Sequence, residues 1–70
     1  MEAGLKEFNV FVVTKTSKVF LGCVITTTAQ QAKQRVLNYL NTKIILDELK
    51  TNSTEYSIVV EVDTSHIIFK

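Results

Sequence analysis

The first two strand-like segments of this chain carry apolar side chains on both of their faces. Side chains alternate along a strand, so residues 8–13 divide into two apolar sets, which are Phe8, Val10, Val12 and Phe11, Val13. Residues 19–25 divide in the same way, into Val19, Leu21, Cys23, Ile25 and Phe20, Gly22, Val24. A single layer of helix covers only one face of a sheet. The second apolar face therefore needs another layer, from this chain or from a partner.

A later segment, over residues 56–63, is apolar on one face only. Its inward set is Tyr56, Ile58, Val60, Val62, and its outward set is Ser57, Val59, Glu61, Asp63. This alternation predicts a third strand over about residues 55–63, with one face against a core. A short fourth strand is expected at residues 67–69.

The segment between these strands has a helical period. Thr28 followed by Gln31 fits a capping box at the start of a helix. Apolar residues then recur at helical spacing and form one stripe, which consists of Ala29, Ala32, Val36, Tyr39 and Leu40. A second stripe on another side, formed by Ile45, Leu46 and Leu49, predicts a break near residue 41 or 42 and a short second helix to about Lys50.

Together these elements predict an α+β fold in two layers, of the order ββα(α)β(β). The sheet is expected to have three or four mainly antiparallel strands, with one kinked or broken helix on one face, in a single domain over residues 1–70. The strand order stays open at this point. The order 2-1-3-4 would leave residues 19–25 on an edge, and such a long apolar edge is a template for pairing with another chain; a mixed sheet with a right-handed crossover is the alternative.

Length and composition restrict the means by which this fold is stabilised. A 70-residue chain buries only ~60% of its unfolded surface, which is close to the limit for folding alone. With one Cys and one His, neither disulfides nor a metal site is expected, and no cofactor or small-molecule substrate is expected either. Oligomerisation is the remaining means. The net charge of +1 gives no general attraction to nucleic acid or membrane.

The chain carries no recognised address for another compartment. Its first residues lack a basic signal-peptide region, and its longest apolar run is too short to span a membrane. We therefore expect a reducing, cytoplasmic location. The seven lysines against one arginine, with no Pro or Trp, suggest an AT-rich genome such as a phage or mobile element has.

No catalytic constellation is expected. The single histidine, His66, lies in a predicted turn without a nucleophile at a recognisable spacing. Cys23 lies mid-strand among apolar residues, where burial would raise its pKa and make it unreactive.

Nucleic-acid binding is the alternative function. It would use the aromatic side chains of an open sheet face for stacking and four basic residues for the phosphates, namely Lys15, Lys18, Lys33 and Arg35. Those positive charges would have to converge in space. The aliphatic neighbours on the same face suit a protein partner better than bases.

The sequence therefore favours a non-enzymatic protein–protein interaction module, of the kind that phages and mobile elements use as structural or accessory proteins or as inhibitors of a host protein. Self-association is expected through the second sheet face, with the interface residues Phe11, Val13, Phe20 and Val24, or edge to edge along the second strand. In the competing interpretation, residues 43–50 fold under the sheet and cover that face within one chain. The identity of any other partner is not encoded in a recognisable motif.

Overall fold

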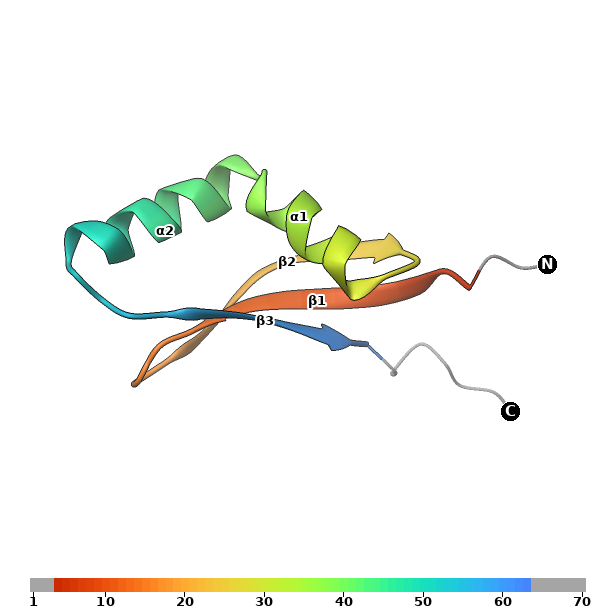
Figure 1. Ribbon diagram of the computed structural model, residues 1–70, viewed down its shortest axis with the longest axis horizontal. Coiled ribbons are helices and arrows are strands. Elements are labelled where there is room, and N and C mark those ends of the chain that lie inside the picture. Colours follow the sequence, from red (N-terminus) through yellow and green to blue (C-terminus); the bar gives the residue numbers. More distant parts are fainter. Residues whose placement is uncertain (1–3, 64–70) are drawn as a thin grey trace.

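The computed structural model describes residues 4–63 and contains a three-stranded sheet and two helices. Their order along the chain is β1 (Lys6–Val13), β2 (Lys18–Thr26), α1 (Ala29–Leu37), α2 (Leu40–Thr51) and β3 (Ser57–Val62). Figure 1 shows the helices as one layer and the strands as the other. This arrangement confirms the predicted two-layer α+β class.

The sheet has the order β2-β1-β3, and both pairs are antiparallel. The predicted order in which the third strand lies beside the first is therefore correct, and the mixed sheet is not formed. Among the described residues, β2 lies at an edge of the sheet. The fourth strand expected at residues 67–69 lies outside the described residues.

A four-residue loop without glycine joins β1 to β2. The Thr14 hydroxyl accepts hydrogen bonds from the backbone N–H groups of Thr16 and Ser17, at 3.3 and 3.1 Å, and the Thr14 N–H donates to the Ser17 carbonyl at 2.9 Å. A threonine hydroxyl that bonds to the backbone two or three residues later mimics a backbone turn. This explains how the hairpin closes without Asn-Gly.

The core lies between α1 and one face of the sheet. The alternate β1 residues Phe8, Val10 and Val12 are at most 3% exposed. Val24 of β2 and the α1 residues Ala32 and Val36 complete the buried set. The central strand thus has neighbours on both edges and a helix above it. Of the predicted inward set, Ile58, Val60 and Val62 lie on this same face by register, whereas Tyr56 precedes β3.

The start of α1 follows the capping prediction in part. The Thr28 hydroxyl accepts a hydrogen bond from the Gln31 N–H at 3.2 Å, with Thr28 in an extended conformation. The Gln31 side chain does not complete a reciprocal box, because its Oε1 accepts instead from the hydroxyls of Thr26 and Thr27, at 2.7 and 3.0 Å. Three successive threonines therefore fix the connection between β2 and α1.

The helix breaks earlier than predicted, at residues 38 and 39. Tyr39 is extended, and its ring lies against Gly22 of β2, where an added Cβ would come within 2.8 Å of the tyrosine Cε2. Gly22 thus provides space for the ring, and the chain turns where the tyrosine meets the sheet. Asn41 and Thr42, where the break was predicted, lie inside α2.

The end of α2 is a Schellman motif. The Ser53 N–H donates to the Lys50 carbonyl at 3.0 Å, and the Thr54 N–H donates to the Leu49 carbonyl at 2.9 Å. Ser53 has a φ of 55°, in the left-handed region where glycine is usual. This turn directs the chain back to the sheet as β3.

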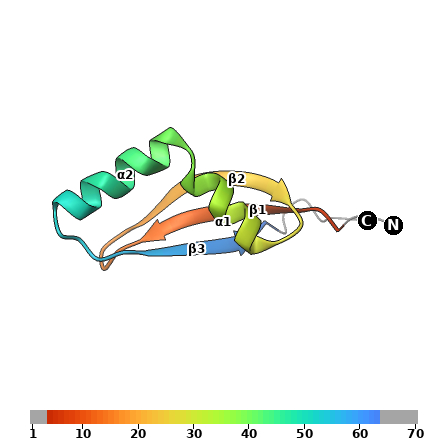
Figure 2. The same ribbon diagram turned by 45° about the horizontal axis from the view of Figure 1, so that its top comes forward.

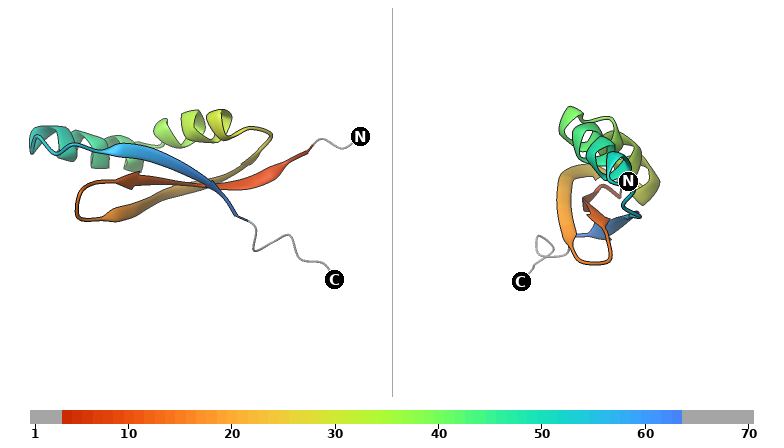
Figure 3. Two further views of the ribbon diagram at one scale, coloured as in Figure 1. Left: turned by 60° about the horizontal axis from the view of Figure 1, so that its bottom comes forward. Right: turned by 90° about the vertical axis from the view of Figure 1, so that its left-hand side faces the viewer.

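Both helices lie on the same side of the sheet (Figures 1 and 3). Residues 43–50 belong to α2, which continues from α1 toward the hairpin end (Figure 2). They do not fold under the sheet. The second face of the sheet is therefore uncovered by the described residues.

The cap predicts unequal roles for neighbouring threonines. Thr28→Ala removes the acceptor of the Gln31 N–H and should lower the free energy of unfolding by about 1 kcal/mol. Thr27→Ala removes one exposed hydroxyl while Thr26 still donates to Gln31, so its effect should be smaller. Urea unfolding followed by circular dichroism measures both, and equal losses would contradict the cap.

A buried hydroxyl in α2 predicts a stabilising substitution. Thr42 is 0% exposed, and its Oγ1 has no hydrogen-bond partner among residues 4–63. Because an unsatisfied buried hydroxyl is unfavourable, Thr42→Val should raise the free energy of unfolding by about 1 kcal/mol. Thr51→Val, at the exposed end of the same helix, is the control and should change it little. A destabilised Thr42→Val protein would show that the hydroxyl has a partner in solution.

Candidate functional site

The uncovered face of the sheet, here called the outer face, is centred on Phe11. In the strand register Phe11 lies opposite Phe20 of β2 and Val59 of β3. The two phenylalanine rings meet edge to face, with centroids 5.6 Å apart, a favourable geometry for aromatic pairs. Val13 lies two residues further along the same face. Phe20 remains 54% exposed, so much of its ring is in contact with solvent.

An ion pair crosses the outer face above Phe11. Lys18 Nζ lies 2.7 Å from Glu61 Oε2 and 4.4 Å from the centroid of the Phe11 ring. The two charged residues come from the outer strands and reach over the central one diagonally. Both side chains are about half exposed, at 47% and 48%, so the pair contributes little stability by itself. The Lys18 ammonium group nevertheless covers part of the Phe11 ring.

A β-bulge changes which β2 residues share this face. The register shifts between Val10 and Phe11, so that Gly22 lies opposite Val10, Phe20 lies opposite Phe11, and Leu21 is the extra residue. Val24 consequently lies on the helix side and is 7% exposed. Its predicted place beside Phe11, Val13 and Phe20 is wrong, because simple alternation does not hold across a bulge.

The bulge moves Ile25 to the outer face. Ile25 pairs with Glu7 and is 61% exposed. The alternation of side chains placed Ile25 on the face opposite to that of Phe20. The one local signal of a bulge is Gly22, next to Leu21, because an isolated glycine within a strand often marks a bulge or a close approach. The contact between Lys18 and Glu61 was also missed, because 43 residues separate the two in sequence.

Several of the exposed large apolar residues belong to β2 and to the helical segment that follows α1. On the strand itself they are Val19, Phe20 and Ile25, and in the following helical segment they are Tyr39, Leu40 and Ile44. Tyr39 is connected to β2 by its contact with Gly22. In contrast, α1 exposes mainly Gln, Lys and Arg side chains. On the outer face itself, the exposed large apolar residues of β2 are therefore Phe20 and Ile25.

Cys23 lies on the outer face of β2 as a protonated thiol. Its Sγ donates a hydrogen bond to Glu7 Oε2 at 2.9 Å. That bond, desolvation, and the negative charges of Glu7 and Asp63 raise the pKa of the thiol from 9.0 to about 11. A thiolate is the reactive form of cysteine, so this site opposes nucleophilic chemistry. His66 lies outside the described residues, and the absence of catalysis stays a prediction.

The basic residues proposed for nucleic-acid binding lie on separate surfaces. Lys15 is at the hairpin tip, and Lys18 is paired with Glu61 over the outer face. Lys33 and Arg35 belong to α1, on the helix side of the sheet. Because residues two apart in a helix point in nearly opposite directions, these two side chains lie on different sides of α1. The fold therefore does not bring the four charges together.

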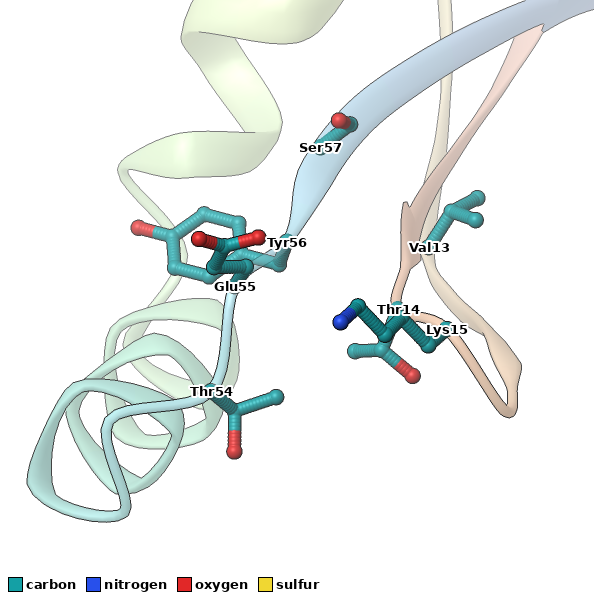
Figure 4. Close-up of a pocket in the computed structure, with 7 residues that line it drawn as sticks. All are labelled: Val13, Thr14, Lys15, Thr54, Glu55, Tyr56 and Ser57. Carbon is teal, nitrogen blue, oxygen red and sulfur yellow. The ribbon is translucent and has the colours of Figure 1, made fainter.

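A shallow hollow of about 510 Å³ lies between the hairpin tip and the connection from α2 to β3 (Figure 4). Its lining includes Lys15, Glu55 and Tyr56 together with several hydroxyl groups. Figure 4 shows Lys15 and Thr54 directed into the space from opposite sides. No group of three or more potential metal ligands occurs among residues 4–63. Within the same part of the chain, neither helix has the length and apolar character needed to cross a membrane.

The thiol geometry predicts slow alkylation that depends on Glu7. Below pH 9 both folded and unfolded thiols are protonated; between pH 9 and about 11 the unfolded thiol ionises first, so the contribution of Cys23 to stability is lost as the pH rises through this range. Glu7→Gln should lower the pKa and speed iodoacetamide alkylation of the folded protein at pH 8. The control is Glu61→Gln, which removes a carboxylate that is paired with Lys18. A rate unchanged by Glu7→Gln would contradict the assigned contact.

Comparisons with protein-family models, with curated proteins and with solved structures find no match to this chain. The function proposed below therefore depends on the geometry of these residues.

Proposed function

We propose that this chain is a small, non-enzymatic protein–protein interaction module that self-associates through the exposed apolar surface of the β1–β2 hairpin. The observation that carries the proposal is the position of both helices on one side of the sheet, which leaves Phe20 and Ile25 exposed on the other. Large apolar side chains that stay exposed on one face of a small domain are typical of an interface.

A second copy of the chain is a suitable partner for reasons of size and charge. A 70-residue domain without a disulfide among its described residues gains stability when association buries further apolar area. The net charge of +1 leaves little long-range repulsion between copies. The outer face also carries both signs of charge, in Lys18 and Glu61, so two copies can meet without opposing like charges.

The nucleic-acid alternative has less support. A basic surface for phosphates requires cations that act together, and here Lys18 is neutralised by Glu61 while the α1 cations lie across the sheet. A role as a phage or mobile-element accessory protein, which acts in the cytoplasm, stays part of the proposal and is supported by composition and small size alone.

Sizing chromatography with light scattering tests self-association. The native chain should show a mass above 7.9 kDa that rises with concentration. The variant Phe20→Lys/Ile25→Lys should return toward the monomer mass, because it places two charges on the apolar surface; lysine also suits a position opposite Glu7. Circular dichroism should show that the variant keeps its fold.

The matched control is Leu40→Lys/Ile44→Lys, which introduces the same charges at equally exposed positions on α2. This control should keep the native oligomeric mass. A native chain of monomer mass at every concentration would overturn self-association. Dissociation by the control alone would place the interface on α2 and overturn the hairpin surface.

A further inference from the structure

The outer edge of β2 offers unpaired backbone groups beside apolar side chains. No described strand lies beyond β2 in the order β2-β1-β3. The edge strand has nine residues and contains no proline, and its one charged residue, Lys18, is at its end. Native edge strands commonly use prolines or central lysines to prevent pairing with other chains. Here the bulge at Leu21 is the only such device, and it leaves a regular segment intact.

That regular segment runs over residues 22–26. Its register with β1 is continuous from Val10 opposite Gly22 to Lys6 opposite Thr26. Within these five residues, one antiparallel self-pairing leaves no residue without a partner, and it is centred on Val24. In this pairing Val24 lies opposite itself, Cys23 opposite Ile25 of the second copy, and Gly22 opposite Thr26 of the second copy.

We infer that two copies of this chain associate by antiparallel pairing of β2 with β2 about Val24, which joins their sheets into one. This inference rests on the proposed self-association and places the contact at the edge of the hairpin, where it includes Ile25 and leaves Phe20 on the exposed outer face. An antiparallel pair on a two-fold axis is a closed, symmetric assembly. Opposite residues share a face in such a pair, so the helices of both copies lie on the same side of the joined sheet.

The side chains of this segment suit the pairing. Ile25, which is 61% exposed, would lie beside Cys23 of the second copy on the outer face, and this contact removes apolar area from water. No charged residue occurs between residues 19 and 26. The two Lys18 side chains would lie at opposite ends of the paired strands, about 40 Å apart at a rise of about 3.3 Å per residue, so they do not repel each other.

Five residue pairs form a small interface, below the size of a standard stable complex. The dimer should therefore be weak and should dissociate on dilution. Covalent capture is a suitable test for such a complex, because it records the register as well as the association.

The test uses Ile25→Cys with the native Cys23, oxidised with copper phenanthroline at hundreds of micromolar protein. Opposite residues of an antiparallel pair have Cβ atoms about 4.5–5.5 Å apart, close to the distance that a disulfide spans. Within one strand, residues two apart are about 7 Å from each other, too far for a bridge. The thiol introduced at the exposed position 25 supplies the reactive thiolate, since Cys23 holds its proton.

The expected product is a reducible dimer with two disulfides, each between residue 23 of one copy and residue 25 of the other, identified by peptide mass spectrometry. The controls are the native chain and Cys23→Ala/Ile25→Cys. In the proposed register, residue 23 lies opposite residue 25 of the second copy. The single cysteine of each control therefore does not lie opposite the same cysteine of the second copy, and the covalent dimer should be lost or strongly reduced. Circular dichroism checks that each variant is folded.

Each other result overturns the inference. Equal cross-linking of the controls means random collision. Dimers in light scattering without the disulfide between residues 23 and 25 keep the proposed self-association and place the interface elsewhere. A monomer at every concentration, with no cross-link, removes both the edge pairing and the proposed function.

Discussion

Burial of the central strand β1 is the constraint on which the rest of this structure depends. β1 has β2 and β3 as neighbours, and its alternate residues Phe8, Val10 and Val12 lie under the helix layer. The close contact of the two layers depends on Gly22 of β2, where an added Cβ would lie 2.8 Å from the Tyr39 ring and 3.5 Å from the Val36 side chain. The two-layer arrangement follows from this contact. The two outer strands pair with β1, and α1 packs on the face that carries its buried residues.

The same constraint leaves the other face of β1 without a layer. Phe11 is partly covered by Phe20 and by the Lys18–Glu61 pair, a local arrangement that shields the ring and still leaves apolar surface at Phe20. Ion pairs and cation–π contacts at half-exposed positions contribute little energy. They reduce the apolar exposure of the outer face without replacing a second layer. With this partial cover, the outer face still exposes Phe20 to solvent.

The bulge at Leu21 changes which residues of β2 face the core before and after it. On one side it brings Phe20 to the outer face, and on the other it turns Val24 into the core and Ile25 outward. Bulges at an edge normally hinder pairing with other chains. In the proposed pairing of β2 with β2, the bulge limits the regular segment to residues 22–26, and the register that pairs all five residues is centred on Val24.

Local patterns in the sequence were enough to predict several elements. Thr28 and Gln31 predicted the helix start because a cap is a contact within one turn. The alternation over residues 56–63 predicted the inward face of β3, because that strand contains no bulge. The two apolar faces of β1 also predicted that one helix layer would leave the second face in need of cover, and left open whether residues 43–50 supply it. In the structure these residues belong to α2 on the helix side. These features depend on residues that are close in sequence and on the fixed period of a helix or strand.

The tertiary structure decided what depends on residues far apart in sequence. The helix breaks at Tyr39 because that ring meets Gly22 on the sheet, and a contact of this kind leaves no periodic signal. Val24 belongs to the core, and Ile25 to the outer face, because the pairing of β2 with β1 places the bulge at Leu21. Lys18 and Glu61 meet only because β1 lies between their strands. In each case the local sequence does not determine the result. Contacts between distant segments that form when β1 is buried determine it, and these contacts exist only in the folded chain.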